Sequence, residues 1–107
     1  MTVYKSGKAW ADNFIVIKAL PNGLELSRYG FSVTKELGKA VVRNRVRRLL
    51  REIVRLTPVK PGWDVVFIAR PSAVAVDYHQ LKKSVDRLLV RAHLLRDRDE
   101  AVSPGVN

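Results

Sequence analysis

Apolar residues between positions 40 and 56 recur at the spacing of an α-helix, and this periodicity constrains the fold more than any other feature. The stripe consists of Val42, Val46, Leu49, Ile53 and Leu56. Side chains spaced i, i+4, i+7, i+11 and i+14 share one helix face, which must be buried against another element. Thr57-Pro58 and Pro61-Gly62 follow, and proline cannot continue a helix. The sequence therefore predicts one amphipathic helix over about residues 40–56.

The segments around this helix have the composition of strands. Residues 13–20 and 24–33 are rich in β-branched and aromatic side chains. The turn signal Pro21-Asn22-Gly23 lies between them, so we expect these two strands to pair antiparallel. Residues 63–69 are mostly apolar and predict an internal strand, and residues 8–11 are a candidate for a further short strand.

A second helix is predicted to begin after Asp77. Asp77 and Gln80 have the spacing of a capping box, in which each side chain satisfies a backbone donor at the helix start. Its apolar face comprises Tyr78, Leu81, Val85, Leu88, Leu89, Ala92 and Leu95. Two amphipathic helices need a sheet to cover, so the chain is expected to form an α+β, two-layer α/β sandwich. We expect one domain over residues 1–95 and a flexible tail over 96–107.

Composition limits the function classes open to this chain. The hydrophobic fraction of 47% is enough for a core, and the formal net charge of +10 favours a polyanionic partner. The absence of cysteine excludes disulfides, iron–sulfur clusters, cysteine-based zinc sites and thiol catalysis. No stretch approaches the roughly 20 apolar residues of a membrane span. The N-terminal residues lack the apolar block of a secretion signal, so a soluble cytoplasmic protein is expected.

The polar side of helix 40–56 is dense in arginine. Arg43, Arg47 and Arg51 are spaced i, i+4, i+8, where like charges repel by a few tenths of a kcal/mol per pair. Arginine also grips phosphate bidentately and stacks on bases better than lysine does. We therefore favour a nucleic-acid-binding surface over a solvated helix face. A membrane-surface helix is disfavoured because the sheet needs the apolar stripe, and a DNA-recognition helix because a strand, not a helix, precedes it.

Other residues suggest metal or catalytic sites on weaker grounds. His79, Asp86 and His93 lie on one predicted helix face but two turns apart, whereas a metal site needs ligands within about one turn. Glu36, Glu52 and Asp64 do not form an obvious carboxylate cluster of the kind a two-metal nuclease needs. We therefore expect no catalytic residue and no metal ligand in this chain, and we assign Trp10 and Trp63 to packing.

The block from Gly30 to Glu52, GFSVTKELGKAVVRNRVRRLLRE, closely resembles the signature of the bacterial ribonuclease P protein subunit family. The triplet Arg43-Asn44-Arg45 is the hallmark of that signature. The likeness extends to Tyr4-Lys5-Ser6-Gly7, to the strand from Trp63 to Pro71 and to the helix after Asp77, and so covers the chain to about Leu95.

The resemblance implies the element order αβββαβα, with a left-handed crossover between the strands that flank the arginine helix. It also implies a function, as the protein subunit of an endoribonuclease that removes the 5′ leader of precursor tRNA. In that family the RNA subunit is the catalyst and requires Mg²⁺, while the protein binds this RNA and the leader. The implied partners are therefore the catalytic RNA and precursor tRNA, with no membrane and no obligate protein partner.

Carried over by position, the family's contacts fall on two sets of residues. The expected contacts with the catalytic RNA are Lys35, Lys39, Arg43, Asn44, Arg45 and Arg48. The expected contacts with the leader are Tyr4, Phe14, Lys18, Ser32, Arg47 and Arg51, because charge and aromatic stacking hold single strands of any sequence.

This chain departs from the family pattern at two points. The family's first helix usually follows a basic segment and carries a phenylalanine one turn before the position of Tyr4. This chain begins at Met1-Thr2-Val3, so either that helix is shortened or translation starts upstream. Lys18 stands where the family commonly has an aromatic residue. Two rival functions stay open at this point, a ribosomal or RNA-chaperone protein and a nuclease that acts without RNA.

Overall fold

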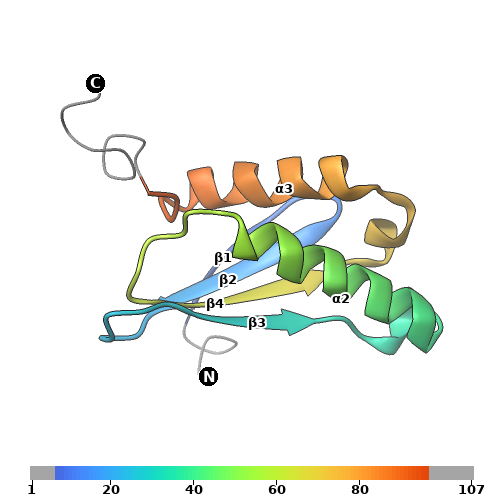
Figure 1. Cartoon of the computed structure of the whole chain (residues 1–107), viewed down its shortest axis with the longest axis horizontal. Helices are drawn as coiled ribbons and strands as arrows, with labels where there is room; N and C mark the ends of the chain where they lie inside the picture. The colour runs from blue at the N-terminus through green and yellow to red at the C-terminus, as the bar shows by residue number, and fades with distance from the viewer. Residues whose placement is uncertain (1–6, 97–107) are drawn as a thin grey trace.

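The computed structural model describes residues 7–96, which form a sheet of four strands with two α-helices and two short 3₁₀ helices. In chain order the elements are β1 (Lys8–Ala11), β2 (Ile15–Pro21), β3 (Arg28–Ser32), η1 (Lys35–Leu37), α2 (Ala40–Arg55), β4 (Trp63–Ala69), η2 (Pro71–Ala75) and α3 (Tyr78–Arg91). Both α-helices lie on the same side of the sheet (Figure 1). The expected two-layer α+β fold is confirmed, while the family's first helix and Tyr4 fall outside the described residues.

The predicted helices agree closely with the structure. The capping box of α3 is present: Gln80 N donates to Asp77 Oδ1 (2.9 Å) and Asp77 N donates to Gln80 Oε1 (3.1 Å). Helix α2 buries a slightly rotated face, made of Val46, Leu50, Ile53 and Val54. The inclusion of Leu56 in the buried stripe was wrong. Leu56 follows the last residue of α2 and is 56% exposed, because its backbone (φ −97°, ψ 2°) has left the helical conformation that would keep it on the buried face.

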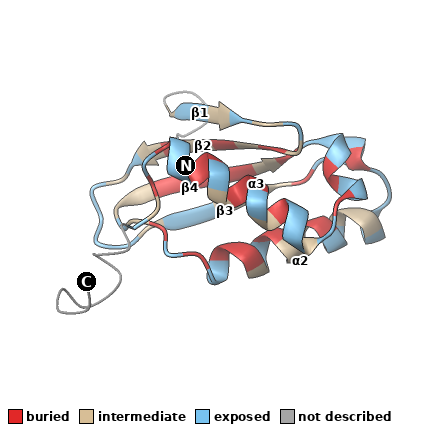
Figure 2. Cartoon of the chain, turned by 90° about the horizontal axis from the view of Figure 1, so that it is seen from above, coloured by how far each residue is buried: buried red, intermediate tan, exposed pale blue. Residues whose placement is uncertain are grey.

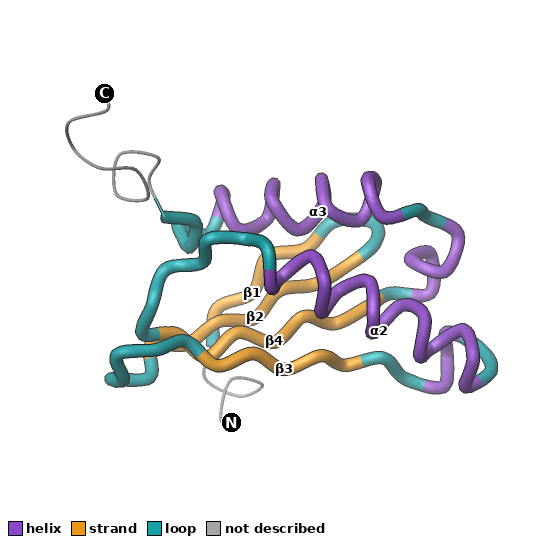
Figure 3. The backbone as a smooth tube through the Cα atoms, viewed as in Figure 1, coloured by secondary structure: helices purple, strands orange, loops and turns teal. Residues whose placement is uncertain are grey.

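The predicted antiparallel hairpin between residues 13–20 and 24–33 was also wrong. The strand order is β1-β2-β4-β3, so β4 lies between the two strands that were expected to pair. Strand β2 pairs antiparallel with both β1 and β4, whereas β3 pairs parallel with β4. The parallel pair is possible because α2 carries the chain back across the sheet between β3 and β4 (Figure 3).

The core lies between the helices and one face of the sheet (Figure 2). Strands β2 and β4 contribute their alternate residues Ile15, Ile17, Ala19, Val65, Phe67 and Ala69, all buried. Because β4 is flanked by strands on both sides and is mostly apolar, it is the natural centre of the sheet. None of the helices in residues 7–96 is long and apolar enough to cross a membrane.

Candidate nucleic-acid interface

The basic face of α2 points away from the sheet because the opposite side of the helix is buried. Five arginines share the exposed surface and its two flanks, namely Arg43, Arg45, Arg47, Arg48 and Arg51. Within residues 7–96 the structure contains four ion pairs, and none of these five side chains takes part in one. The self-repelling surface that the sequence predicted is therefore not neutralised by the described part of the fold.

These arginines make few hydrogen bonds. Two of the bonds are exposed to solvent, and a third is long. Arg43 Nε donates to the carbonyl oxygen of Gly38 (3.2 Å), and Arg47 Nη1 donates to Asn44 Oδ1 (3.0 Å). Arg45 extends toward α3 and donates to Val76 O at 3.4 Å, the long end of the hydrogen-bond range. Each of these guanidinium groups keeps further N–H donors for a phosphate.

The segment before α2 adds two lysines to this surface. Buried Leu37 anchors η1, and Gly38 reverses the chain with φ of 121°, a conformation that favours glycine. Lys35 and Lys39 are consequently exposed beside the start of α2. Lys39 is the N-cap residue, no side chain caps the helix, and its first turn has no acidic residue. The positive end of the helix dipole thus adds to the lysine charges and favours an anion here.

The face of the sheet opposite the helices, called the open face here, forms a second surface. No described helix covers it (Figure 1). The strand register places its side chains in rows across the sheet, one running Ala9–Lys18–Val66–Gly30 and the next running Ala11–Val16–Ile68–Ser32. The outer strands contribute small residues to these rows. Lys18 and Ser32 are half-buried on this face, and Val66 between them is 2% exposed.

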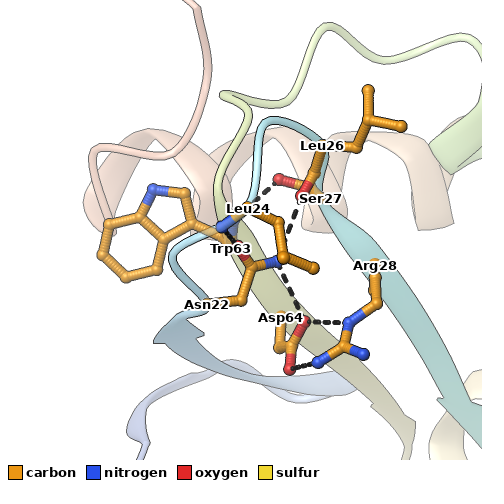
Figure 4. A network of polar contacts seen from close by, with 7 residues as sticks. All are labelled: Asn22, Leu24, Leu26, Ser27, Arg28, Trp63 and Asp64. Carbon is orange, nitrogen blue, oxygen red and sulfur yellow. Dashed lines mark hydrogen bonds and ion pairs between the residues drawn. The ribbon is translucent and has the colours of Figure 1, made fainter.

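A third row of the open face is occupied by an internal ion pair. Arg28 contacts both carboxylate oxygens of Asp64, with Nε to Oδ1 at 2.8 Å and Nη2 to Oδ2 at 2.7 Å. This pairing lowers the pKa of Asp64, and Asn22 Nδ2 adds a third hydrogen bond at 3.1 Å. The network fastens the β2–β3 loop to β4 (Figure 4). The charge of Arg28 is therefore used in an internal ion pair that stabilises the fold.

The residues expected to contact the leader do not all share one surface. Lys18 and Ser32 lie on the open face, whereas Arg47 and Arg51 lie on α2, on the helix-bearing side of the sheet. Phe14 is half-buried and packs against the core in the turn between β1 and β2. Tyr4 lies outside the described residues. The structure thus brings together only part of the predicted set.

The acidic and histidine side chains of residues 7–96 form no group of three that is suited to hold a metal ion. Asp64 is engaged by Arg28, and Glu52 is engaged by Arg55 one turn along the same helix. That second pairing also lowers the pKa of Glu52, with the hydrogen bond from Arg55 as the main cause. The described carboxylates are therefore mostly used in internal contacts and face different parts of the molecule.

Sequence reasoning missed three residues that the structure places near the basic helix. Tyr29, Phe31 and Arg96 line a cavity beside Arg51, at the sheet edge formed by β3. The spacing of Tyr29 and Phe31 places both rings on one face of a strand, which is a signal the sequence contained. Arg96 lies far along the chain, and only folding brings it to the same place.

Comparisons with known proteins identify relatives of this chain by sequence. The family model described as Ribonuclease P matches residues 1–93. The ribonuclease P protein component of Caldanaerobacter subterraneus is 46% identical over 99 residues, covering 91% of this chain and 85% of that protein. The one from Dehalococcoides mccartyi is 46% identical over 101 residues, covering 94% and 84%.

Solved structures extend the likeness to three dimensions. The RNase P protein of Staphylococcus aureus superposes with a TM-score of 0.79 at 31% identity, covering 89% of each chain. The RNase P protein of Thermotoga maritima superposes with a TM-score of 0.78 at 32% identity, covering 83% of this chain and 86% of that one.

Proposed function

The chain belongs to the bacterial ribonuclease P protein family, and on that premise we propose that two of its surfaces bind two different RNAs. The basic face of α2 binds the catalytic RNA, and the open face of the sheet binds the 5′ leader of precursor tRNA. Family membership itself makes the chain a subunit of the ribonuclease P holoenzyme, an endoribonuclease of tRNA processing and a ribonucleoprotein with an RNA subunit.

The observation that carries the first assignment is the unpaired arginine surface. Five guanidinium groups of α2 lie within a few turns of one another and form no ion pair in the described residues, and Lys35 and Lys39 adjoin them. A protein stabilises such a surface when a partner supplies negative charge. The assigned contacts are Lys35, Lys39, Arg43, Asn44, Arg45 and Arg48.

The second assignment rests on the shape and chemistry of the open face. A single strand of arbitrary sequence needs a surface that accepts its backbone without reading its bases. The small residues of β1 and β3 leave room for a strand, and Lys18 and Ser32 offer a cation and a hydroxyl in neighbouring rows. Phe14 precedes β2 and is assigned to the margin of this path, whereas Arg47 lies on the helix-bearing side of the sheet and is left out of it.

We assign the hydrolytic chemistry, including its Mg²⁺, to the RNA subunit. Within residues 7–96 no group of three acidic or histidine side chains is suited to hold the ion. In this assignment the protein holds and positions the two RNAs, and its cations offset the repulsion between their phosphates.

The finer topology implied by the resemblance is part of the same proposal. We assign a left-handed sense to the connection from β3 through α2 to β4, against the usual preference for right-handed crossovers. Figure 1 supports this hand, because β3 and β4 point the same way, α2 lies on the viewer's side, and β4 lies above β3. An experimental structure of the chain tests it directly.

Reconstitution tests the proposed function. Purified protein is added to a bacterial ribonuclease P RNA and a precursor tRNA at a magnesium concentration that limits cleavage by the RNA alone. We expect the protein to restore removal of the leader. A protein that binds ribosomal RNA but leaves cleavage unchanged would support the chaperone alternative, and cleavage without added RNA would support the nuclease alternative.

Two variants separate the two surfaces in the same assay. Lys18→Glu is expected to weaken binding of precursor tRNA to the holoenzyme and to leave binding of leaderless tRNA unchanged. Arg48→Ala is expected to weaken assembly with the catalytic RNA. If both variants change only assembly, the open face is not the leader surface.

A further inference from the structure

A cavity of about 480 Å³ lies at the β3 edge of the sheet, on the helix-bearing side, and none of the contacts assigned above explains it. The rings of Tyr29 and Phe31 form one wall, and the end of α2 and the segment 57–59 form the other. Its volume falls within the range of small-molecule pockets, about 300–1,000 Å³. The open face with Lys18 and Ser32 is on the other side of the sheet.

The aromatic wall is a fixed platform. Tyr29 and Phe31 project from the same face of β3, and both contact the fully buried ring of Phe67 on the neighbouring strand. Phe31 stacks on Phe67 with centroids 5.7 Å apart, and Tyr29 lies 6.4 Å from it. Tyr29 is nevertheless 39% exposed. A rigid aromatic surface that stays accessible to solvent is the kind on which a nucleobase stacks.

The charged side of the cavity is entirely basic. Arg51, Arg55 and Arg96 line it, and none of the other lining residues is acidic. Arg55 is engaged by Glu52, but Arg51 forms no ion pair in the described residues. Arg96 is held in place through its backbone, where its N–H donates to Pro58 O at 2.8 Å. Arginine side chains close to an aromatic platform suit a phosphate attached to a stacked base.

We propose that this cavity binds one unpaired nucleotide of RNA, with the base stacked on Tyr29 and Phe31 and the phosphate held by Arg51 and Arg96. The site explains why Arg51 points away from the open face. It goes beyond the leader and α2 assignments, since it depends on neither Lys18 nor Arg48. The nucleotide belongs either to the catalytic RNA or to precursor tRNA, which offer the same chemistry.

Adenosine monophosphate is the probe for the site, titrated into the isolated protein at physiological salt and followed by NMR of aromatic and arginine side chains. We expect shifts at Tyr29, Phe31 and Arg51 with one common dissociation constant. Loss of one base stack or one phosphate contact should weaken binding about fivefold or more in Tyr29→Leu and Arg96→Ala. Tyr29→Phe keeps the ring and should bind within about twofold of the parent protein.

Matched probes and a control variant separate this site from general attraction to a basic protein. Adenosine alone and inorganic phosphate alone should each bind more weakly than the nucleotide. Lys83→Ala removes one positive charge from exposed α3 and should change binding by less than about twofold. Equal shifts with inorganic phosphate, or equal losses in Lys83→Ala and Arg96→Ala, would overturn the proposal.

The source of the nucleotide is found by measuring Tyr29→Leu and Arg96→Ala against each RNA. A loss of affinity for the catalytic RNA alone places the nucleotide there, and a loss seen only for precursor tRNA in the holoenzyme places it in the substrate. If both affinities stay unchanged, the cavity does not bind RNA and the proposal fails. That result would leave the Lys18 and Arg48 tests unaffected, so the two proposals fail independently.

Discussion

Helices α2 and α3 lie side by side on one face of the same sheet, yet their polar surfaces are stabilised in opposite ways (Figure 2). Helix α3 begins with a complete capping box and carries a Lys82–Asp86 ion pair at 2.9 Å. Helix α2 begins at Ala40 without a side-chain cap from Lys39. It carries the Glu52–Arg55 ion pair in its last turn, but Arg43, Arg47 and Arg51 repel one another.

Asp12 makes the contrast sharper, because it joins α3 to the sheet. Its carboxylate accepts the N–H groups of Phe14 (2.8 Å) and Ile15 (3.1 Å) and the hydroxyl of buried Ser84. Arg87 of α3 lies 3.9 Å from the same carboxylate. Among the described residues α2 has no comparable polar link to the sheet. The comparison teaches that the polar residues of α3 are tied to the rest of the fold, whereas the arginines of α2 lack such contacts, which is what the proposed RNA contact needs.

The largest expected effect comes from cutting the polar link of α3. Asp12→Ala leaves two backbone donors and the Ser84 hydroxyl without their acceptor, and should lower the free energy of unfolding by about 2–3 kcal/mol. Urea unfolding measures the loss. The control is Asp86→Ala, which breaks only an exposed pair and should cost about 0.5 kcal/mol or less. Equal losses of unfolding free energy in the two variants would show that Asp12 contributes no more to stability than an exposed ion pair does.

The next largest effect is a loss of affinity for the catalytic RNA when arginines of α2 are replaced. Arg43→Ala and Arg48→Ala should each weaken binding to the catalytic RNA by about 1–2 kcal/mol and reduce the slope of log K against log salt by about one phosphate contact. Filter binding over a salt series measures both quantities. Unfolding free energies should change by less than about 0.5 kcal/mol. An unchanged salt slope would place these side chains away from the RNA.

The cap of α3 offers a test of intermediate size. Asp77→Ala removes the acceptor for Gln80 N and should destabilise the protein by about 1 kcal/mol. Thermal or urea unfolding detects this change. Asp77→Asn keeps a side-chain oxygen at the N-cap and should stay close to the parent protein. A similar loss in Asp77→Asn would show that charge, rather than the cap, is what matters.

The start of α2 should respond in the opposite direction. Lys39→Asp supplies a capping acceptor and a favourable charge, and should stabilise the free protein by about 0.5–1 kcal/mol. The same change should weaken binding to the catalytic RNA, because it replaces a cation with an anion. Lys39→Ala removes the cation without adding a cap, so it should weaken binding without the gain in stability. A stabilised variant that binds RNA normally would contradict the role assigned to Lys39.

The smallest expected effect is a change of stability with pH. Although burial alone raises the pKa of Asp12, the hydrogen bonds from Ser84, Phe14 and Ile15 outweigh it and lower the pKa below the ordinary 3.8. A lowered pKa in the folded state stabilises the protein above about pH 4, and this contribution disappears as the pH falls through the folded value. Unfolding free energies measured from pH 6 to pH 2 should fall more steeply in the parent protein than in Asp12→Asn. If stability falls equally with pH in the two proteins, the Asp12 carboxylate does not make this contribution.

The sequence predicted the elements well because their signals are local. The spacing from Val42 to Ile53 reports one helix face, and Asp77 with Gln80 reports a helix start, with no information needed from distant residues. The family signature similarly identified the arginine surface. The assignment of Leu56 to the core failed because the pattern does not show where a helix ends to within one residue.

The sequence was a poorer guide to which residues come together at each candidate site. Arg51 was grouped with Ser32 because the family resemblance implies leader contacts at both positions, but the fold separates them onto opposite sides of the sheet. Arg28 gave no signal of its pairing with Asp64, which lies 36 positions away. Tyr29 and Arg96 come together only because the segment after α3 returns to the end of α2.

The sequence by itself determined which segments are helices and strands, which side of each helix is apolar, and that arginines gather on the polar side of α2. The order of the strands was decided only by the tertiary structure, which places β4 between β2 and β3. The physical reason is that alternation along a strand specifies which side chains face the core, while its hydrogen-bonding edges are the same for every neighbour. Burying the apolar strand β4 between two partners selects this order, and with it the open face and the cavity beside Tyr29.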